Sequence, residues 1–190
     1  MTVEEIFQNL AAHMIKGVMT HEQFANYYDF LNLEGYKRCH EYHMMKEMCD
    51  YRSLCRYYIN HYNKLIRDIP IENPHVIPEN WYNYTRKEVD AGTKRNAVST
   101  ALNAWVNWET ETKKLYEQAF KDLMELGEVA GACKIKEYIQ DVDCELKKAT
   151  RYLLNKETTQ YDINSIVSEQ KRKHHKYKKK METELKVYLC

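Results

Sequence analysis

Apolar residues recur every three or four positions along four long stretches of the chain, which is the pattern of amphipathic helices. These stretches cover approximately residues 3–31, 35–67, 96–128 and 132–155. A fifth helix is expected over approximately residues 162–188, where Ile163, Ile166 and Val167 precede a strongly basic run. The pattern therefore predicts an all-α fold.

Helix-breaking residues are concentrated at a few places between these stretches. All three prolines fall within residues 68–95, at Pro70, Pro74 and Pro78. A connection this long allows the chain to return along the bundle, which makes the second and third helices parallel. The turn after the third helix is short and carries Gly127 and Gly131, so the third and fourth helices are antiparallel neighbours. Residues 3–155 are thus expected to form a four-helix bundle with a long crossover. Residues 156–190 are expected to form an additional C-terminal helix, packed on the bundle or extending from it.

Composition narrows the protein class further. The chain has 190 residues and a net charge of +1, and it has no apolar run long enough to cross a bilayer. Its first residues lack the basic and apolar regions of a signal peptide. These features favour a cytoplasmic protein with no membrane partner. The cysteines form no Cys-x-x-Cys pair and are expected to be free thiols in or near the core: Cys39, Cys49, Cys55, Cys133, Cys144 and Cys190.

Several polar residues interrupt the apolar faces of the predicted helices. These residues are His21 in the first helix, His40, His43 and Glu47 in the second, and Glu109 in the third. A buried charge is costly unless it is paired or binds a metal. The polar residues are therefore the candidates for a functional site.

The predicted topology brings these residues to one level of the bundle. Glu47 and Glu109 lie at similar depths in two parallel helices, and His21 lies opposite His43 across the first turn. Counting back through the third turn adds Glu145 from the fourth helix, with Asp141 one turn away and His40 nearby. Carboxylates and imidazoles that converge inside a four-helix bundle form dinuclear metal sites, and these donors suit iron or manganese.

Three segments carry a resemblance to the ferritin-like superfamily. LEGYKRCHEYHMMKEMCDYRSL is similar to the second helix of ferritins, AWVNWETETKKLYEQA to the third and KEYIQDVDCELKKA to the fourth. The resemblance covers approximately residues 3–155 and implies that Glu47 and Glu109 are metal ligands. It also implies iron oxidation or storage, with oxygen or peroxide as a further partner and a homo-oligomeric assembly.

The chain departs from the family pattern at three positions. The Glu-x-x-His pair of the family would place a histidine where this chain has Asp50, and no glutamate lies between Met14 and Val18. In the fourth helix, sequence matching favours Asp141, whereas helix geometry favours Glu145. The metal site is therefore either rearranged around His21 and His43 or degenerate. The predicted ligand set is Glu47, Glu109, Glu145, His43, His21, His40, Asp141 and Asp50.

Two other functions remain open from the sequence. The first is a structural or interaction protein that has the four-helix bundle but binds no metal. In that case Glu47 and Glu109 would pair with Arg52, Arg56 or Arg151. Alternatively, the basic run from Lys171 to Lys180 can contact nucleic acid by neutralising phosphates, although such a run is more often a solvated helix face.

Overall fold

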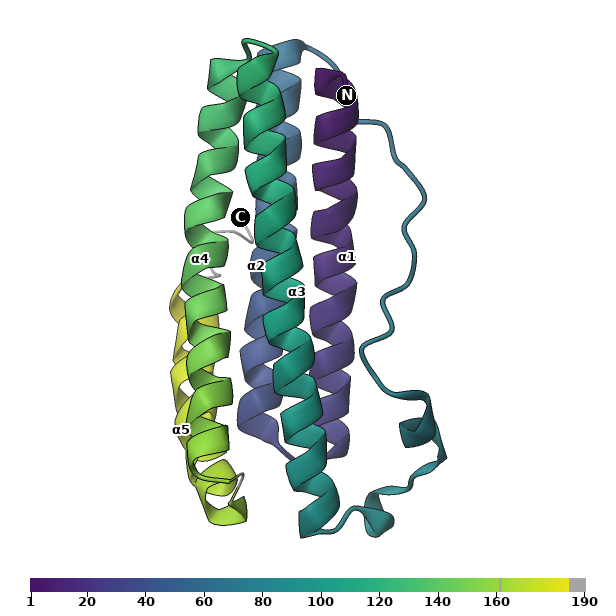
Figure 1. Cartoon of the computed structure of the whole chain (residues 1–190), viewed down its shortest axis with the longest axis vertical. Helices are drawn as coiled ribbons and strands as arrows, with labels where there is room; N and C mark the ends of the chain where they lie inside the picture. Colours follow the sequence, from purple (N-terminus) through teal and green to yellow (C-terminus); the bar gives the residue numbers. More distant parts are fainter. Residues whose placement is uncertain (161, 185–190) are drawn as a thin grey trace.

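The computed structural model describes residues 1–160 and 162–184, and within them it contains α-helices and short 3₁₀ turns but no strand. Figure 1 shows four long helices side by side, with a fifth, shorter helix against one side. The helices are α1 (Val3–Phe30), α2 (Glu34–Tyr62), α3 (Ala91–Glu125), α4 (Val129–Thr158) and α5 (Ile163–Thr183). The predicted all-α bundle with an additional C-terminal helix is confirmed.

The first two helices form an antiparallel pair. A capping box starts α1, in which the Glu5 amide donates to Thr2 Oγ1 and the Thr2 amide donates to Glu5 Oε2. The turn to α2 is short and passes through Asn32, whose φ of 55° lies in the left-handed region. The α2 helix ends at Tyr62 because Asn63 adopts a left-handed C-cap with a φ of 55°. The expected end near residue 67 was therefore too late, and Leu65, which follows the end of the helix, is 77% exposed.

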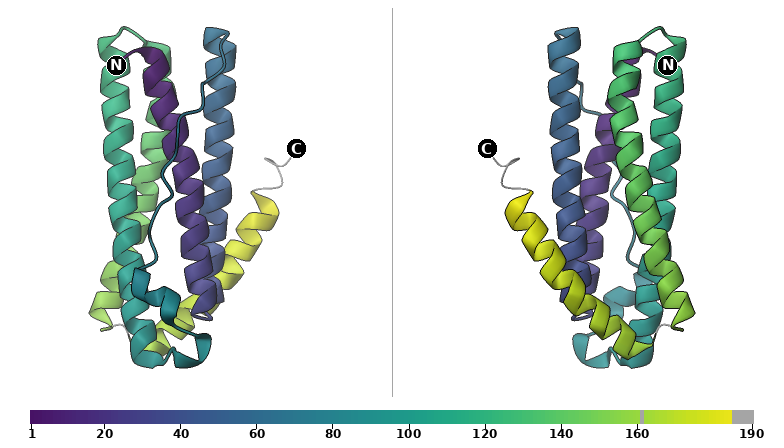
Figure 2. Two further views of the ribbon diagram at one scale, coloured as in Figure 1. Left: turned by 90° about the vertical axis from the view of Figure 1, so that its right-hand side faces the viewer. Right: turned by 90° about the vertical axis from the view of Figure 1, so that its left-hand side faces the viewer.

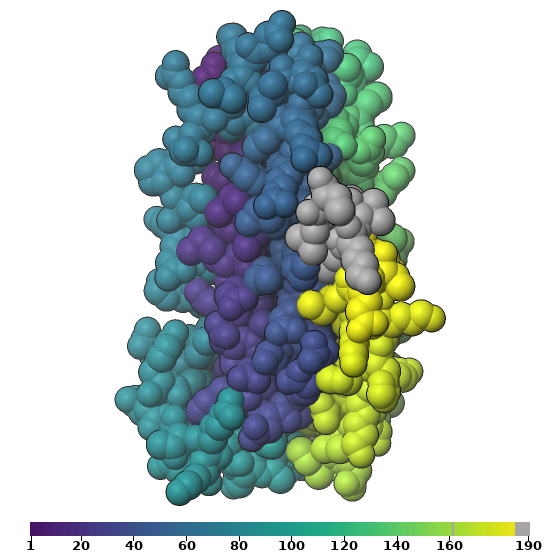
Figure 3. All heavy atoms as spheres, turned by 180° about the vertical axis from the view of Figure 1, so that it is seen from behind, coloured from purple at the N-terminus to yellow at the C-terminus, as the bar shows by residue number. Residues whose placement is uncertain are grey.

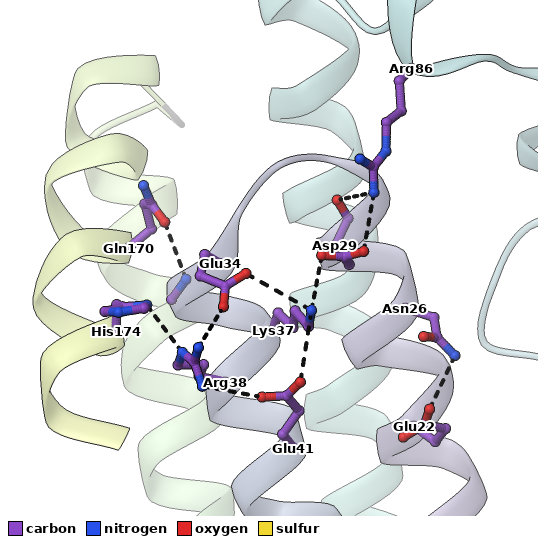
Figure 4. Close-up of polar contacts among 11 residues, drawn as sticks. Glu22, Asn26, Asp29, Glu34, Lys37, Arg38, Glu41, Arg86, Gln170 and His174 are labelled. Carbon is purple, nitrogen blue, oxygen red and sulfur yellow. Dashed lines mark hydrogen bonds and ion pairs between the residues drawn. The ribbon is translucent and has the colours of Figure 1, made fainter. Parts of the chain in front are cut away.

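Residues 63–90 form the predicted crossover. Figure 1 shows this segment descending along the outside of α1 to the opposite end of the bundle. Val76 donates its amide to Gln23 Oε1, and Arg86 binds the Asp29 carboxylate at 3.1 Å (Figure 4). Because the chain returns to the end where α2 began, α3 runs parallel to α2.

The third helix begins earlier than its apolar pattern indicated. Asp90 caps it by accepting a hydrogen bond from the Thr93 amide, so α3 starts at Ala91 instead of near residue 96. Gly127, with a φ of 76°, lies in the short turn to α4, and α4 runs antiparallel to α3.

Two apolar clusters fill the bundle, one toward each end. The cluster near the α1–α2 turn includes Phe24, Tyr28, Leu31, Leu102 and Trp105. The cluster near the α3–α4 turn includes Phe7, Leu10, Met14, Leu123 and Ile135. Burial of these side chains supplies the main driving force for folding. The tyrosines along α2 lie only partly inside these clusters, because Tyr36 and Tyr58 are buried but Tyr51 and Tyr62 are half-buried.

The fifth helix packs against α2 and crosses the lower half of the bundle (Figures 2 and 3). Gly35 permits this close approach, since a Cβ there would overlap the backbone carbonyl of Gln170. The Gly35 amide donates to Gln170 Oε1, and Arg38 Nε donates to His174 Nδ1 at 3.2 Å (Figure 4). One face of α5 is therefore buried, and it includes Lys173 from the basic run.

The five cysteines of the described region have free thiols, as expected. Only Cys39 is buried, whereas Cys133 and Cys144 are exposed and correct the expectation that the thiols lie in or near the core. Cys190 lies outside the described residues. Among the described residues, no helix has the length and apolar character needed to span a membrane.

Candidate metal-binding site

A layer of titratable side chains crosses the bundle between its two apolar clusters. Helix α1 contributes one of them, α2 three, and α3 and α4 one each: His21, His40, His43, Glu47, Glu109 and Glu145. All of these residues are buried except Glu47, which is half-buried. The structure therefore brings together six of the eight predicted site residues.

His21 and His40 are joined through their ring nitrogens. The two Nδ1 atoms lie 3.1 Å apart, so one ring donates its proton to the other. Burial lowers the pKa of His21 to about 3 and holds the pKa of His40 well below its ordinary value. Both imidazoles are consequently neutral at neutral pH. The second nitrogen of His21, Nε2, is buried and makes no hydrogen bond to a described residue.

Glu109 faces that unsatisfied nitrogen from α3. Its Oε1 atom lies 3.8 Å from His21 Nε2 and accepts a 2.7 Å hydrogen bond from the Trp105 indole N–H. Burial, reinforced by the negative charge of Glu145, raises the pKa of Glu109 to about 8. The His21–Glu109 contact therefore joins two neutral groups at neutral pH and is not a salt bridge.

Glu47 has no cation of its own. Its carboxyl group lies against Gly17 of α1, where an added Cβ would stand 3.1 Å from the Glu47 Cδ atom. Burial of the carboxyl group and the neighbouring Glu109 raise the pKa of Glu47 well above its ordinary value. No hydrogen bond or ion pair joins the Glu47 carboxyl to another side chain of the described region. Gly17 thus leaves the space that this unpaired carboxyl occupies.

The other half of the layer is a compensated ion network. His43 Nδ1 lies 2.5 Å from Glu145 Oε2, and Lys46 Nζ donates to Glu145 Oε1 at 3.1 Å. Burial alone would raise the pKa of Glu145, but the charges of His43 and Lys46 outweigh burial and hold it well below its ordinary value. Burial likewise lowers the pKa of His43, but Glu145 outweighs it and raises the pKa overall. This half therefore carries its own balancing charges.

The two predicted aspartates lie at the edge of this layer. Asp141 is exposed, and its carboxylate is 3.3 Å from Lys46 Nζ. Asp50 is half-buried, and burial raises its pKa to about 6. The backbone carbonyl of Asp50 accepts a hydrogen bond from the Tyr138 hydroxyl. Of the two α4 candidates, Glu145 is the one whose carboxylate reaches the interior.

The sequence analysis missed Lys46, and the alternative in which Glu47 and Glu109 pair with arginines is wrong. Neither Glu47 nor Glu109 pairs with an arginine among the described residues, and Arg52, Arg56 and Arg151 are exposed. Lys46 was hidden because it lies beside the apolar stripe of α2 and reaches Glu145 along its flexible side chain. Gly17 did give a signal, because it is a lone glycine in the interior of a long helix.

As these side chains lie, no three histidine, cysteine, aspartate or glutamate groups of the described region are arranged to hold a metal ion.

The fold of the chain is similar to that of several solved structures. An open-pore ferritin from the hyperthermophilic archaeon Archaeoglobus fulgidus matches with a TM-score of 0.76 at 12% identity, over 90% of this chain and 94% of that chain. A closed form of that ferritin made by mutagenesis matches equally, and a humanized archaeal ferritin matches at 13% identity with the same TM-score. No protein-family model and no curated protein sequence matches. The chain has the ferritin-like fold.

Proposed function

We propose that this ferritin-like chain is a metal-binding protein that takes up one iron ion as cargo in the core of its bundle. The proposed ligands are Glu47, Glu109 and the Nε2 atom of His21. The proposal rests above all on Glu47 and Glu109, two neighbouring carboxyl groups of the bundle interior, neither of which forms an ion pair with a lysine or arginine of the described region. Iron is favoured because the structural neighbours are ferritins.

Three features of the side chains support this assignment. Carboxylate oxygens and a neutral imidazole nitrogen are suitable donors for iron or manganese. His21 Nε2 is buried with no hydrogen bond, and its Nδ1 contact with His40 fixes the orientation of the ring, as an outer-sphere partner does for a histidine ligand. Gly17 leaves the space in which the Glu47 carboxyl lies inside the bundle. Binding requires Glu47 and Glu109 to turn toward His21 and lose their protons.

We do not extend the proposal to the dinuclear site expected from the sequence. A second ion would need His43 and Glu145, but these groups bind one another, and Lys46 already supplies a positive charge there. An ammonium group in this position balances the carboxylate in the way that a second metal ion would. Oxygen or peroxide chemistry, homo-oligomerisation and nucleic-acid binding stay predictions from the sequence.

Anaerobic titration of chelator-treated protein with Fe(II) or Mn(II) tests the proposal. We expect one equivalent to bind, and Glu47→Gln to abolish binding while the helical circular dichroism is retained. The matched control is Glu111→Gln, which changes the same chemical group at an exposed position of α3. Gly17→Ala adds a methyl group against Glu47 and should weaken binding without removing a ligand. Binding of well under one equivalent by the unmodified chain would leave a helical structural protein as its role.

A further inference from the structure

An open pocket of about 430 Å³, lined by polar and charged residues, lies between the end of α4 and the beginning of α5, away from the titratable layer of the bundle. We propose that this pocket binds inorganic phosphate in a protonated form. The end of α4 and its C-cap contribute Asn155, Lys156, Thr158 and Thr159 to the lining. Helix α5 contributes Ser165, Ser168, Glu169 and Arg172. The volume is ample for a tetrahedral oxyanion together with water molecules.

The charges under the pocket favour an anion. Lys156 and Lys173 are each only 1% exposed, yet they share a single carboxylate, that of Glu169. Lys156 Nζ lies 2.6 Å from Glu169 Oε2, whereas Lys173 Nζ lies 3.8 Å from Glu169 Oε1. Arg172, which lines the pocket and is exposed, adds a third positive charge. Three cations around one carboxylate leave an excess of positive charge, and a bound anion would balance it.

Lys173 is only weakly paired, since its nearest carboxylate oxygen is Glu169 Oε1 at 3.8 Å. Its ammonium group makes no hydrogen bond to a described residue and lies over the rings of Tyr152 and Tyr36, at 3.3 and 4.3 Å from their centroids. Burial lowers the pKa of Lys173 to about 8. A negative ion beside Arg172 and Lys156 would lower the electrostatic cost of keeping Lys173 charged.

The lining also offers an acceptor that selects among anions. Glu169 lines the pocket, and its buried Oε1 accepts no hydrogen bond within the described region, so this carboxylate would have to turn toward a bound anion to accept a proton from it. Hydrogen phosphate carries both anionic oxygens, which accept from Arg172, Lys156 and the serine hydroxyls, and a P–OH group, which donates to a carboxylate. Sulfate has the same shape but carries no proton at neutral pH, so it would leave Glu169 Oε1 without a donor. The pocket should therefore prefer phosphate to sulfate.

Isothermal titration of the metal-free full chain with sodium phosphate, and with sodium sulfate at matched ionic strength, tests the inference. We expect saturable binding of one phosphate per chain and much weaker binding of sulfate. Arg172→Ala should reduce phosphate affinity about tenfold or more, because it removes a charge-assisted hydrogen bond. Lys171→Ala, a change to the adjacent exposed cation that does not line the pocket, should alter affinity by about twofold or less.

Ser168→Ala provides a second variant at an exposed position, so that loss of binding cannot be ascribed to unfolding. It removes a hydroxyl from the pocket and should also weaken phosphate binding. Absence of saturable phosphate binding, equal affinity for sulfate, or equal phosphate affinity in the Arg172→Ala variant would each overturn the inference. Because the protein is metal-free throughout, these outcomes are independent of the metal-binding proposal.

Discussion

Replacing Glu109 by glutamine removes a carboxyl group whose ionised form is disfavoured by burial in the bundle. The glutamine side chain has nearly the same shape, and its amide oxygen can accept the hydrogen bond that the Trp105 indole donates to Glu109. The apolar packing around the site is left in place. The variant therefore isolates the cost of keeping this carboxyl group inside the protein.

The magnitude follows from the pKa. The ordinary value of 4.5 is raised to about 8 for Glu109, which is 1% exposed. At about pH 7 the group is ionised in the unfolded chain but protonated in the folded chain, and folding must take up that proton at a cost of about 3 kcal/mol. Stability from this group is greatest below the unfolded pKa and is lost as the pH rises from about 4.5 to about 8. At about pH 5 the cost falls to under about 1 kcal/mol.

Urea unfolding of chelator-treated protein, followed by circular dichroism at several pH values, measures this cost. We expect Glu109→Gln to be more stable than the unmodified chain by up to about 3 kcal/mol near neutral pH. The difference should shrink as the pH approaches about 5. The same variant should lose the stabilisation that an added metal ion gives, because it lacks the proposed ligand.

The control for this experiment is Glu111→Gln on the exposed face of the same helix, which should leave the pH profile unchanged. The reasoning is refuted if unfolding free energies of Glu109→Gln and the unmodified chain run parallel with pH. It is also refuted if the glutamine variant is the less stable protein at neutral pH, since Glu109 would then be held as a charged and well-partnered group.

Three further predictions address the metal, the fifth helix and the compensated ion network. Metal affinity should rise with pH through neutrality, because the ion must displace the protons of Glu47 and Glu109; a flat Mn(II) affinity profile would contradict this. Gly35→Ala should detach α5 from α2 and speed amide hydrogen exchange across α5, whereas Gly92→Ala, whose added Cβ meets only Asp90 Oδ1 at 3.5 Å, should not. Lys46→Met should lower the free energy of unfolding by about 1–3 kcal/mol by removing a charged partner of buried Glu145. Lys147→Met on the exposed side of α4 is its control, and equal stability of the two variants would count against the ion network.

The fold could be predicted because the helix-breaking residues are few and lie almost entirely between the helices. The three prolines define the crossover, and the crossover determines that α2 and α3 are parallel. Helix ends were less predictable, since they depend on caps that interrupt or extend an apolar pattern. Asp90 begins α3 before its stripe becomes regular, and Asn63 ends α2 while apolar residues continue.

The membership of the titratable layer was also predictable in large part. Residues on the inner faces of four helices must meet if their levels agree, and His21, His43, Glu109 and Glu145 do meet in the core. The partners within that layer were not predictable, because they depend on side-chain torsions and on which cation reaches which carboxylate. Lys46 is the cation that reaches Glu145, and nothing in its position along the sequence distinguishes it from a surface lysine.

The division of the layer into two halves explains why the metal-site pattern of the sequence is incomplete. Where the family places a histidine, Asp50 stays at the edge, and Lys46 with His43 balances Glu145 instead. The charges of that half are therefore balanced without a metal ion. Where ferritins place a glutamate in the first helix, this chain has Gly17, and the Glu47 carboxyl of α2 lies against it without an ion-pair partner among the described residues. A loss of metal binding throughout the site would be expected to leave both halves apolar or paired, because unpaired buried carboxyl groups destabilise a fold. The half that holds Glu47 and Glu109 is therefore the half to which we assign the proposed ion.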